Sequence, residues 1–173
     1  MNKNLVLTGM MGVGKSTIGK KLAKKLKFKF IDIDFIIEKK ERKKIDEIFK
    51  TKGEKYFRKI EEKTTLKFLD RERQVISLGG GSFLNKKVRN KALSSSVTVW
   101  MDLSIKFILK RLKNVKKRPL LDGKDLENSF GKIYNDRKKI YSQANFKIKC
   151  DFKNVNEIIK KINNLYESTR NKV

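Results

Sequence analysis

One stretch near the start of the chain has the residue types and spacing to hold a chain of phosphates. Residues 9–16 are Gly-Met-Met-Gly-Val-Gly-Lys-Ser, which matches the pattern G-x-x-x-x-G-K-[ST] at every fixed position. In such a loop backbone N–H groups surround the β- and γ-phosphates, the lysine adds a positive charge and the serine hydroxyl ligates Mg²⁺. The pattern therefore predicts a site for ATP and Mg²⁺, without indicating which molecule accepts the phosphate.

The surroundings of this loop agree with the motif. It follows an apolar run at residues 4–8 and opens a helical pattern at residues 15–27, whereas a chance match would not need this context. The residues expected to contact the nucleotide are Gly12, Val13, Gly14, Lys15, Ser16 and Thr17. Ser16 is also the expected metal ligand.

Two aspartates stand at the carboxyl end of the second apolar run, residues 28–33. If the strand continues through Asp34, alternation along it places the Asp32 and Asp34 carboxylates on the same side. One could then reach the magnesium, directly or through water, while the other accepts a hydrogen bond from the acceptor's hydroxyl. Alternatively, these residues begin a helix, where aspartate is a favourable N-cap. Since the chain has no histidine, Asp34 is the best candidate for the hydroxyl contact.

Three consecutive glycines, Gly79, Gly80 and Gly81, follow a third apolar run at residues 74–78. Glycine has no side chain, so the backbone here can approach a ligand closely and offer its N–H groups. The alternative is a flexible turn. Three of the chain's 10 glycines stand together here, which favours a ligand contact.

Arginine is scarce in this chain, which makes its positions informative. Of 45 basic residues only 9 are arginine, and a guanidinium group suits bidentate binding of carboxylates and phosphates. Arg58 could simply pair with Glu61 on one helix face. Arg118 could be a solvated loop charge or a finger over the phosphates, and Arg137 could face the ligand or pair with a neighbouring carboxylate.

The net charge of +26 invites a nucleic-acid hypothesis, but the lysines are spread through nearly every expected helix instead of clustering on one face. No apolar stretch approaches the roughly 20 residues of a membrane-spanning helix, and the run at residues 5–8 is too short for a signal peptide. With one cysteine and no histidine, we expect neither a disulfide within the chain nor a zinc site. We therefore expect a cytoplasmic monomer that binds neither nucleic acid nor membrane.

Expected strands and helices alternate along a single domain of 173 residues. The expected strands are residues 4–8, 28–33, 74–78, 97–102 and 146–150. The expected helices are 15–27, 34–70 with a break near Gly53, 86–93, 105–112, 126–141 and 155–165, with a turn at 94–96 and a frayed end from residue 168. Such alternation predicts an α/β fold, a parallel five-stranded sheet with helices on both faces. The phosphate loop, the aspartate pair and the glycine triplet all fall at carboxyl ends of strands, where such sheets bind ligands.

In combination, the motifs closely resemble the shikimate kinase family. They are G-x-x-x-x-G-K-S-T at 9–17, D-x-D at 32–34, F-R-x-x-E at 57–61, L-G-G-G at 78–81, R-P-L-L at 118–121 and D-R-x-x-x-Y at 136–141. This family transfers phosphate from ATP to the 3-hydroxyl of shikimate, with Mg²⁺, in chorismate and aromatic amino-acid biosynthesis. The resemblance implies a three-layer P-loop fold like that of nucleoside monophosphate kinases. It also implies a mobile lid near residues 113–125 and a substrate-binding helical segment near residues 34–62.

The resemblance also implies roles for single residues. Asp34 would orient the attacking hydroxyl, while Lys15 and the lid residue Arg118 would stabilise the transferred phosphoryl group. Arg58 and Arg137 would clamp the shikimate carboxylate.

The remaining implied residues surround the two substrates and the metal. Gly80 and Gly81 would donate backbone N–H bonds to shikimate, and Glu61 would hold the first clamp arginine in place. Phe49 and Phe57 would form the apolar wall of the substrate pocket, and Arg111 and Pro119 would flank adenine. Arg118 would contact ATP from the lid, and the metal would be held by Ser16 and, through water, by Asp32.

The chain departs from the family pattern at two places. The lid is unusually basic at residues 115–118, and Ser82-Phe83 follows the glycine triplet. Neither departure is expected to touch an assigned residue, so both should bear on rate or lid behaviour and not on the class of substrate.

Two other functions are compatible with parts of the sequence. Another kinase of the same fold, for gluconate or a nucleoside monophosphate, would share the phosphate loop, but a nucleotide acceptor would need aromatic stacking and base-edge donors instead of a carboxylate clamp. A basic nucleic-acid-binding or ATP-sensing module would have no need of the acceptor-site motifs.

Overall fold

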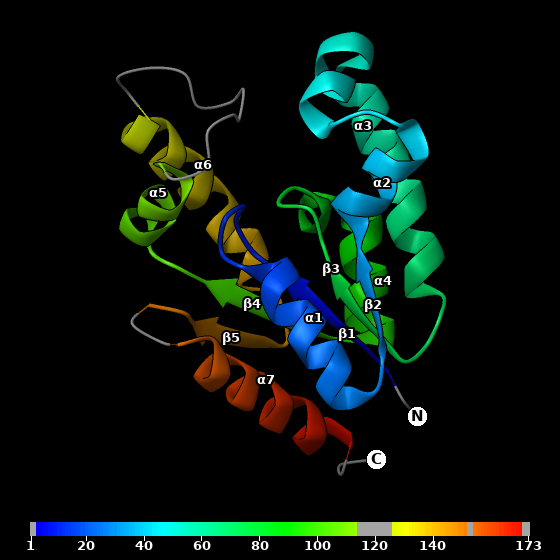
Figure 1. The fold of residues 1–173 in the computed structure, drawn as a ribbon, viewed down its shortest axis with the longest axis vertical. Coiled ribbons are helices and arrows are strands. Elements are labelled where there is room, and N and C mark those ends of the chain that lie inside the picture. The colour runs from blue at the N-terminus through cyan, green and yellow to red at the C-terminus, as the bar shows by residue number, and fades with distance from the viewer. Residues whose placement is uncertain (1–2, 114–125, 152–153, 171–173) are drawn as a thin grey trace.

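A parallel sheet forms the centre of the molecule in the computed structural model, which describes residues 3–113, 126–151 and 154–170 (Figure 1). The strands are β1 (Asn4–Thr8), β2 (Lys29–Asp32), β3 (Gln74–Ser77), β4 (Ser96–Asp102) and β5 (Phe146–Lys149). They lie in the order β2-β3-β1-β4-β5, and every neighbouring pair is parallel. The predicted five-stranded parallel sheet is thus confirmed. Strands β1, β3 and β4 are buried along their whole length, as expected when both faces are covered.

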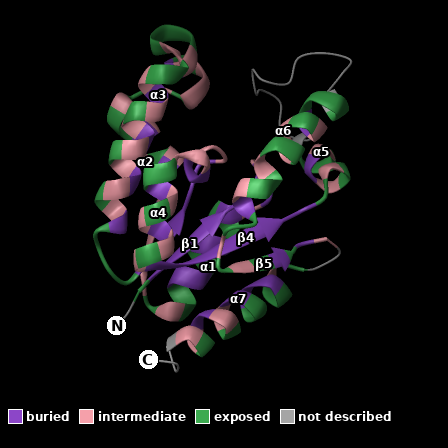
Figure 2. Ribbon diagram, turned by 180° about the vertical axis from the view of Figure 1, so that it is seen from behind, coloured by how far each residue is buried: buried purple, intermediate pink, exposed green. Residues whose placement is uncertain are grey.

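Helices cover both faces of this sheet. They are α1 (Lys15–Leu26), α2 (Ile33–Glu41), α3 (Ile45–Leu69), α4 (Lys86–Ser95), α5 (Ile105–Lys113), α6 (Leu126–Tyr141) and α7 (Val155–Arg170), with a short 3₁₀ turn η1 (Ser82–Leu84). Helices α1 and α7 pack together on one face, while α4 packs on the other against α3 (Figure 1). Figure 2 shows the buried residues on the sheet and on the inner sides of the helices. Within the described ranges, no helix has the length and apolar character needed to cross a membrane.

The single helix expected over residues 34–70 is in fact two helices. Helix α2 ends where Arg42 takes a left-handed conformation (φ 54°), and α3 begins after Lys44, which is extended. Helical spacing of apolar residues continues on both sides, so the break leaves no mark on the periodicity. The predicted break near Gly53 is confirmed, because this residue interrupts α3 with φ 79° and ψ 165°.

Two expected irregular segments are regular instead. Helix α4 runs through Ser95 and β4 starts at Ser96, so the serines expected to form a turn belong to a helix and a strand. Helix α7 continues to Arg170, although fraying was expected from residue 168. The hydroxyls of Ser168 and Thr169 donate to carbonyls of their own helix, which satisfies them without leaving the helical conformation.

The strand order places two glycine-rich segments side by side. The phosphate loop follows β1, the glycine triplet follows β3, and these strands are direct neighbours. The Leu78 amide continues the pairing by donating to the Leu7 carbonyl at 3.0 Å. A Cβ placed on Gly80 would lie 3.4 Å from the backbone nitrogen of Met11, so the glycine turn packs directly against the loop.

Two glycine-to-alanine substitutions should change stability in opposite directions. At Gly53 a new Cβ would meet no atom within 4 Å, but its conformation is one that only glycine adopts easily. We therefore expect Gly53→Ala to lower the free energy of unfolding by about 1–3 kcal/mol through backbone strain. Gly131 lies inside α6, where a Cβ would make an ordinary 3.8 Å contact with Ile105. Gly131→Ala should be neutral or stabilising by up to about 1 kcal/mol.

Urea denaturation of both variants measures these changes directly. If Gly53→Ala proved as stable as the unmodified chain, the strained conformation at this position would be wrong.

Candidate active site

A cleft of about 830 Å³ opens at the carboxyl end of the sheet. It lies where α2 and α3 face the glycine turn and α6. Many of the residues predicted from the sequence line it together: Ser16, Asp32, Asp34, Phe49, Phe57, Arg58, Glu61, Gly80, Gly81 and Arg137. Residues far apart in the chain therefore meet at one site, as the strand-end argument predicted.

The phosphate loop connects β1 to α1, so its backbone N–H groups lie at the N-terminus of a helix. This position favours an anion because the helix dipole and the first N–H groups point toward it. The Lys15 side chain is only 8% exposed and lies within the loop. Its ammonium donates to the carbonyls of Gly9 at 2.8 Å and Met10 at 2.9 Å. A lysine positioned in this way adds its charge to the loop that would hold the phosphates.

The remaining predicted nucleotide contacts differ in how far the structure describes them. Gly12, Val13, Gly14 and Thr17 lie in the loop and the first turn of α1. Arg111, from α5, donates to the Val13 carbonyl at 3.0 Å, so it contacts the loop. Its contact with adenine stays a prediction. Two further predicted residues lie outside the described ranges: Arg118 and Pro119.

The argument that placed two aspartates on one side of a strand is wrong, although both carboxylates reach the cleft. Strand β2 ends at Asp32, which is the N-cap of α2 and accepts a hydrogen bond from the Phe35 amide at 3.2 Å. Asp34 lies in the first turn of that helix. The alternative of a helix start is therefore correct. Both aspartates line the cleft together with Ser16.

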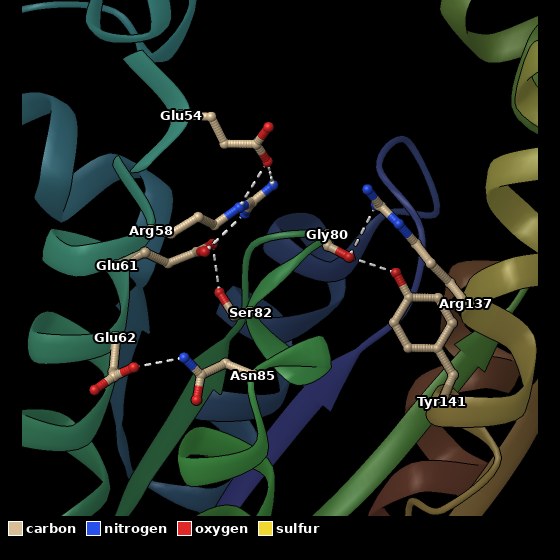
Figure 3. Close-up of polar contacts among 9 residues, drawn as sticks. All are labelled: Glu54, Arg58, Glu61, Glu62, Gly80, Ser82, Asn85, Arg137 and Tyr141. Carbon is tan, nitrogen blue, oxygen red and sulfur yellow. Dashed lines mark hydrogen bonds and ion pairs between the residues drawn. The ribbon is translucent and has the colours of Figure 1, made fainter. Parts of the chain in front are cut away.

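Arg58, on α3, is surrounded by two carboxylates and two aromatic rings. Its Nη1 donates to Glu61 Oε2 at 2.8 Å, and its Nε and Nη2 both lie 3.1 Å from Glu54 Oε1 (Figure 3). The guanidinium carbon lies 5.3 Å from the ring centre of Phe57 and 5.9 Å from that of Phe49. Packing and ion pairs together fix its planar group at the edge of the cleft.

The charge of this arginine is maintained by its partners. Burial disfavours the charged form, but the charge and hydrogen bond of Glu61, with the hydrogen bond and charge of Glu54, more than compensate and raise the pKa of Arg58. The Glu61 side chain is only 4% exposed. Such a buried carboxylate needs partners, because an unpaired buried charge costs several kcal/mol.

Ser82 supplies the second partner of Glu61. Its hydroxyl donates to Glu61 Oε1 at 2.6 Å, whereas the other oxygen of the same carboxylate pairs with Arg58 (Figure 3). The expectation that the Ser82-Phe83 departure touches no assigned residue is therefore wrong. A single sequence could not reveal this contact, because Glu61 and Ser82 lie on different elements, 21 positions apart.

The glycine turn is close-packed against the protein's own functional side chains. A Cβ on Gly79 would lie 2.5 Å from Glu61 Oε1 and 2.6 Å from Asp34 Oδ1, distances that real contacts do not reach. A Cβ on Gly81 would lie 2.8 Å from the guanidinium carbon of Arg58. Glycine here lets two carboxylates and an arginine approach the backbone, and a larger residue would have to displace the ends of these side chains.

Arg137, from α6, lies on the opposite side of this turn from Arg58 (Figure 3). Its Nη1 donates to the Gly80 carbonyl at 3.1 Å, and the Tyr141 hydroxyl donates to the same oxygen. Of the two possibilities that spacing left open, the contact with the cleft is correct. The two arginines thus flank the Gly80–Gly81 backbone.

Among the residues to which sequence reasoning assigned no role are Glu54, Ser82 and Tyr141, which hydrogen-bond to residues of the cleft. Glu54 could have been found, because it stands four positions before Arg58 on the same helix face. Tyr141 belonged to a recognised motif but had no assigned chemistry. Ser82 was treated only as a departure from a pattern.

Comparisons with known proteins agree on one group. The family model described as shikimate kinase matches residues 11–167. The shikimate kinase of Sulfurihydrogenibium sp. (strain YO3AOP1) is 43% identical over 92% of this chain and 95% of its own length. That of Bacillus subtilis (strain 168) is 41% identical over 86% of this chain and 81% of its own.

Solved structures point the same way. Shikimate kinase from Acinetobacter baumannii in complex with shikimate superposes with a TM-score of 0.91 and 29% identity, covering 96% of this chain and 94% of that one. A gluconokinase from Sinorhizobium meliloti 1021 gives a TM-score of 0.63 at 18% identity, over 99% of this chain and 97% of that one. The second likeness concerns the fold alone.

Removing the Ser82 hydroxyl should destabilise the protein measurably. In Ser82→Ala the buried Glu61 carboxylate loses one of its donors, so we expect the free energy of unfolding to fall by about 1–3 kcal/mol. The matched control is Ser94→Ala, whose exposed hydroxyl donates to the Lys91 carbonyl of its own helix. It should change stability by less than about 0.5 kcal/mol. Equal stabilities of the two variants in urea denaturation would rule out a supporting role for Ser82.

Proposed function

The chain belongs to the shikimate kinase family, and we propose that it uses ATP and Mg²⁺ to phosphorylate the 3-hydroxyl of shikimate. The products are shikimate 3-phosphate and ADP, in chorismate and aromatic amino-acid biosynthesis. The observation that carries this proposal is the pair of arginines, Arg58 and Arg137, on either side of a glycine turn that packs against the phosphate loop. This arrangement suits a small acceptor with a carboxylate.

The acceptor half of the proposed site matches the chemistry of shikimate. Its carboxylate would pair with Arg58 and Arg137, since planar guanidinium groups bind carboxylates in fixed geometry. Its ring would lie against Phe49 and Phe57, whose ring centres are 4.8 Å apart. Asp34 would accept a hydrogen bond from a ring hydroxyl and so orient the attacking oxygen. The A. baumannii relative contains bound shikimate, which supports this assignment.

The donor half consists of the phosphate loop and the N-terminus of α1. Backbone N–H groups from Gly12 to Thr17 would bind the β- and γ-phosphates of ATP, with Lys15 adding its charge. Phosphoryl transfer goes through a loose transition state, so positioning and charge neutralisation provide most of the catalysis. Such a reaction does not depend on a strong base, so the Asp34 carboxylate is sufficient to orient the hydroxyl. The contribution of Arg118 rests on its motif alone.

The oxygen donors near the loop fit a magnesium ion. Mg²⁺ usually keeps several waters and takes one or two carboxylates in addition to substrate phosphates. In the part of the chain that the structure describes, no three His, Cys, Asp or Glu side chains gather into a metal cluster. A site of two protein oxygens, Ser16 directly and Asp32 through water, is consistent with this, and both residues line the cleft. When bound, the ion would neutralise charge on the phosphates.

The proposed partners and location follow from the substrates. Because ATP and shikimate are metabolites of the cell interior, we place the reaction in the cytoplasm. All residues of the proposed site come from one chain, so a monomer is sufficient for the reaction. We assign no role to nucleic acid or membranes.

The choice of acceptor is tested by measuring ADP release in a coupled assay. We expect ATP- and Mg²⁺-dependent turnover with shikimate, and only background rates with no acceptor, with gluconate or with a nucleoside monophosphate. Turnover of gluconate or of the nucleotide in preference to shikimate would replace the proposed acceptor by that molecule. Binding of nucleic acid that weakens steeply with salt, without any kinase activity, would instead support the basic module.

Removing either clamp arginine should weaken the use of shikimate. Arg58→Ala and Arg137→Ala would each remove one of the two partners of the substrate carboxylate, so kcat/KM for shikimate should fall by the equivalent of about 2–5 kcal/mol. The control is Arg71→Ala, because Arg71 is exposed and stacks on Phe68 away from the cleft. An unchanged kcat/KM in both clamp variants would contradict the proposed carboxylate site.

A further inference from the structure

Tyr141 is a fully buried residue whose hydroxyl contacts both the glycine turn and the phosphate loop. It is the last residue of α6, and its hydroxyl donates to the backbone carbonyl of Gly80 (Figure 3). The same oxygen lies 3.8 Å from the sulfur of Met10 in the phosphate loop. Its ring centre is 6.0 Å from that of Trp100 on β4. The hydroxyl therefore lies at the junction of the glycine turn and the phosphate loop, and its ring is packed against the sheet.

The Gly80 carbonyl receives two hydrogen bonds from one helix. Arg137 Nη1 donates to it at 3.1 Å, in addition to Tyr141. These residues are four positions apart and so lie one turn apart on the same face of α6. A carbonyl oxygen has two lone pairs, and α6 supplies a donor for each. The direction of this carbonyl is thus determined by α6.

The direction of the carbonyl also determines the direction of the next amide. Among the described residues no peptide bond is cis, so the Gly80 carbonyl and the Gly81 N–H point in opposite directions across one planar unit. Gly81 lines the cleft beside Arg58. We infer that Tyr141 is a positioning residue: its hydroxyl holds the Gly80 carbonyl toward α6 and thereby turns the Gly81 N–H to the opposite side, toward the part of the cleft beside Arg58. This inference rests on the proposed function, in which that N–H binds shikimate.

Tyr141 is suited to hold the carbonyl throughout the reaction. Burial raises the pKa of its phenol, and the opposing effect of the nearby Arg137 and Arg58 guanidinium groups does not cancel this. The hydroxyl therefore stays protonated, and remains a donor, well above neutral pH. Because the residue is buried, it does not compete for the substrate carboxylate, whereas Arg137 faces the cleft and is proposed to bind that carboxylate.

The test is Tyr141→Phe, which removes one oxygen and keeps the ring. A single hydrogen bond is worth roughly fivefold in affinity, so the KM for shikimate should rise roughly fivefold, while kcat and the KM for ATP change less than about twofold. The matched control is Tyr134→Phe on the same helix. It removes a hydroxyl that donates to Asp102 at 2.7 Å, and it should leave the KM for shikimate unchanged.

Hydrogen exchange provides a second measurement that does not depend on catalysis. Tyr141→Phe should speed exchange in the peptide that contains residues 79–82, and Tyr134→Phe should not. An unchanged KM for shikimate with unchanged exchange, or equal rises in both KM values that Tyr134→Phe reproduces, would overturn the inference. If the unmodified protein did not phosphorylate shikimate, the proposed function would fail, and the exchange experiment would still decide whether Tyr141 orders the glycine turn.

Discussion

The parallel pairing of β1 with β3 is the interaction on which both halves of the site depend. Leu5, Val6 and Leu7 pair with Val75, Ile76 and Ser77 in the buried centre of the sheet. Since the strands are parallel and adjacent, the segments that leave their carboxyl ends emerge next to each other. One segment is proposed to bind phosphates with its backbone N–H groups, and the other carries the glycines that allow carboxylates and an arginine to approach. A shift in this register would separate the two.

On the acceptor side of the site, two carboxylates and an arginine lie around the glycine turn. Asp34 and Glu61 both lie close to Gly79, where their mutual repulsion must be offset by partners. One oxygen of Glu61 accepts from Ser82 and the other from Arg58, so the Glu61 carboxylate holds the Arg58 guanidinium group at the cleft. In the proposed site the acceptor is recognised by a few buried or half-buried groups.

The sequence predicted the features that local chemistry determines. Apolar runs located the strands, and the glycine and arginine motifs predicted which residues would meet at the strand ends. The prediction was wrong where the same local pattern is compatible with two structures. Helical periodicity did not mark the break at Arg42. The strand pattern was extended to Asp34, although α2 begins at Ile33. The prediction also missed the support of Glu61 by Ser82 and of the Gly80 carbonyl by Tyr141, because these contacts join distant elements and have no fixed spacing.

The central claim is that the site consists of two separable halves joined at the glycine turn. Isothermal titration of shikimate and of ATP into Lys15→Ala and Arg58→Ala measures this most directly. The account predicts that Lys15→Ala binds shikimate within about threefold of the unmodified protein, and that Arg58→Ala binds ATP equally well but shikimate at least about thirtyfold more weakly. Loss of shikimate binding in Lys15→Ala, or its retention in Arg58→Ala, would contradict the account.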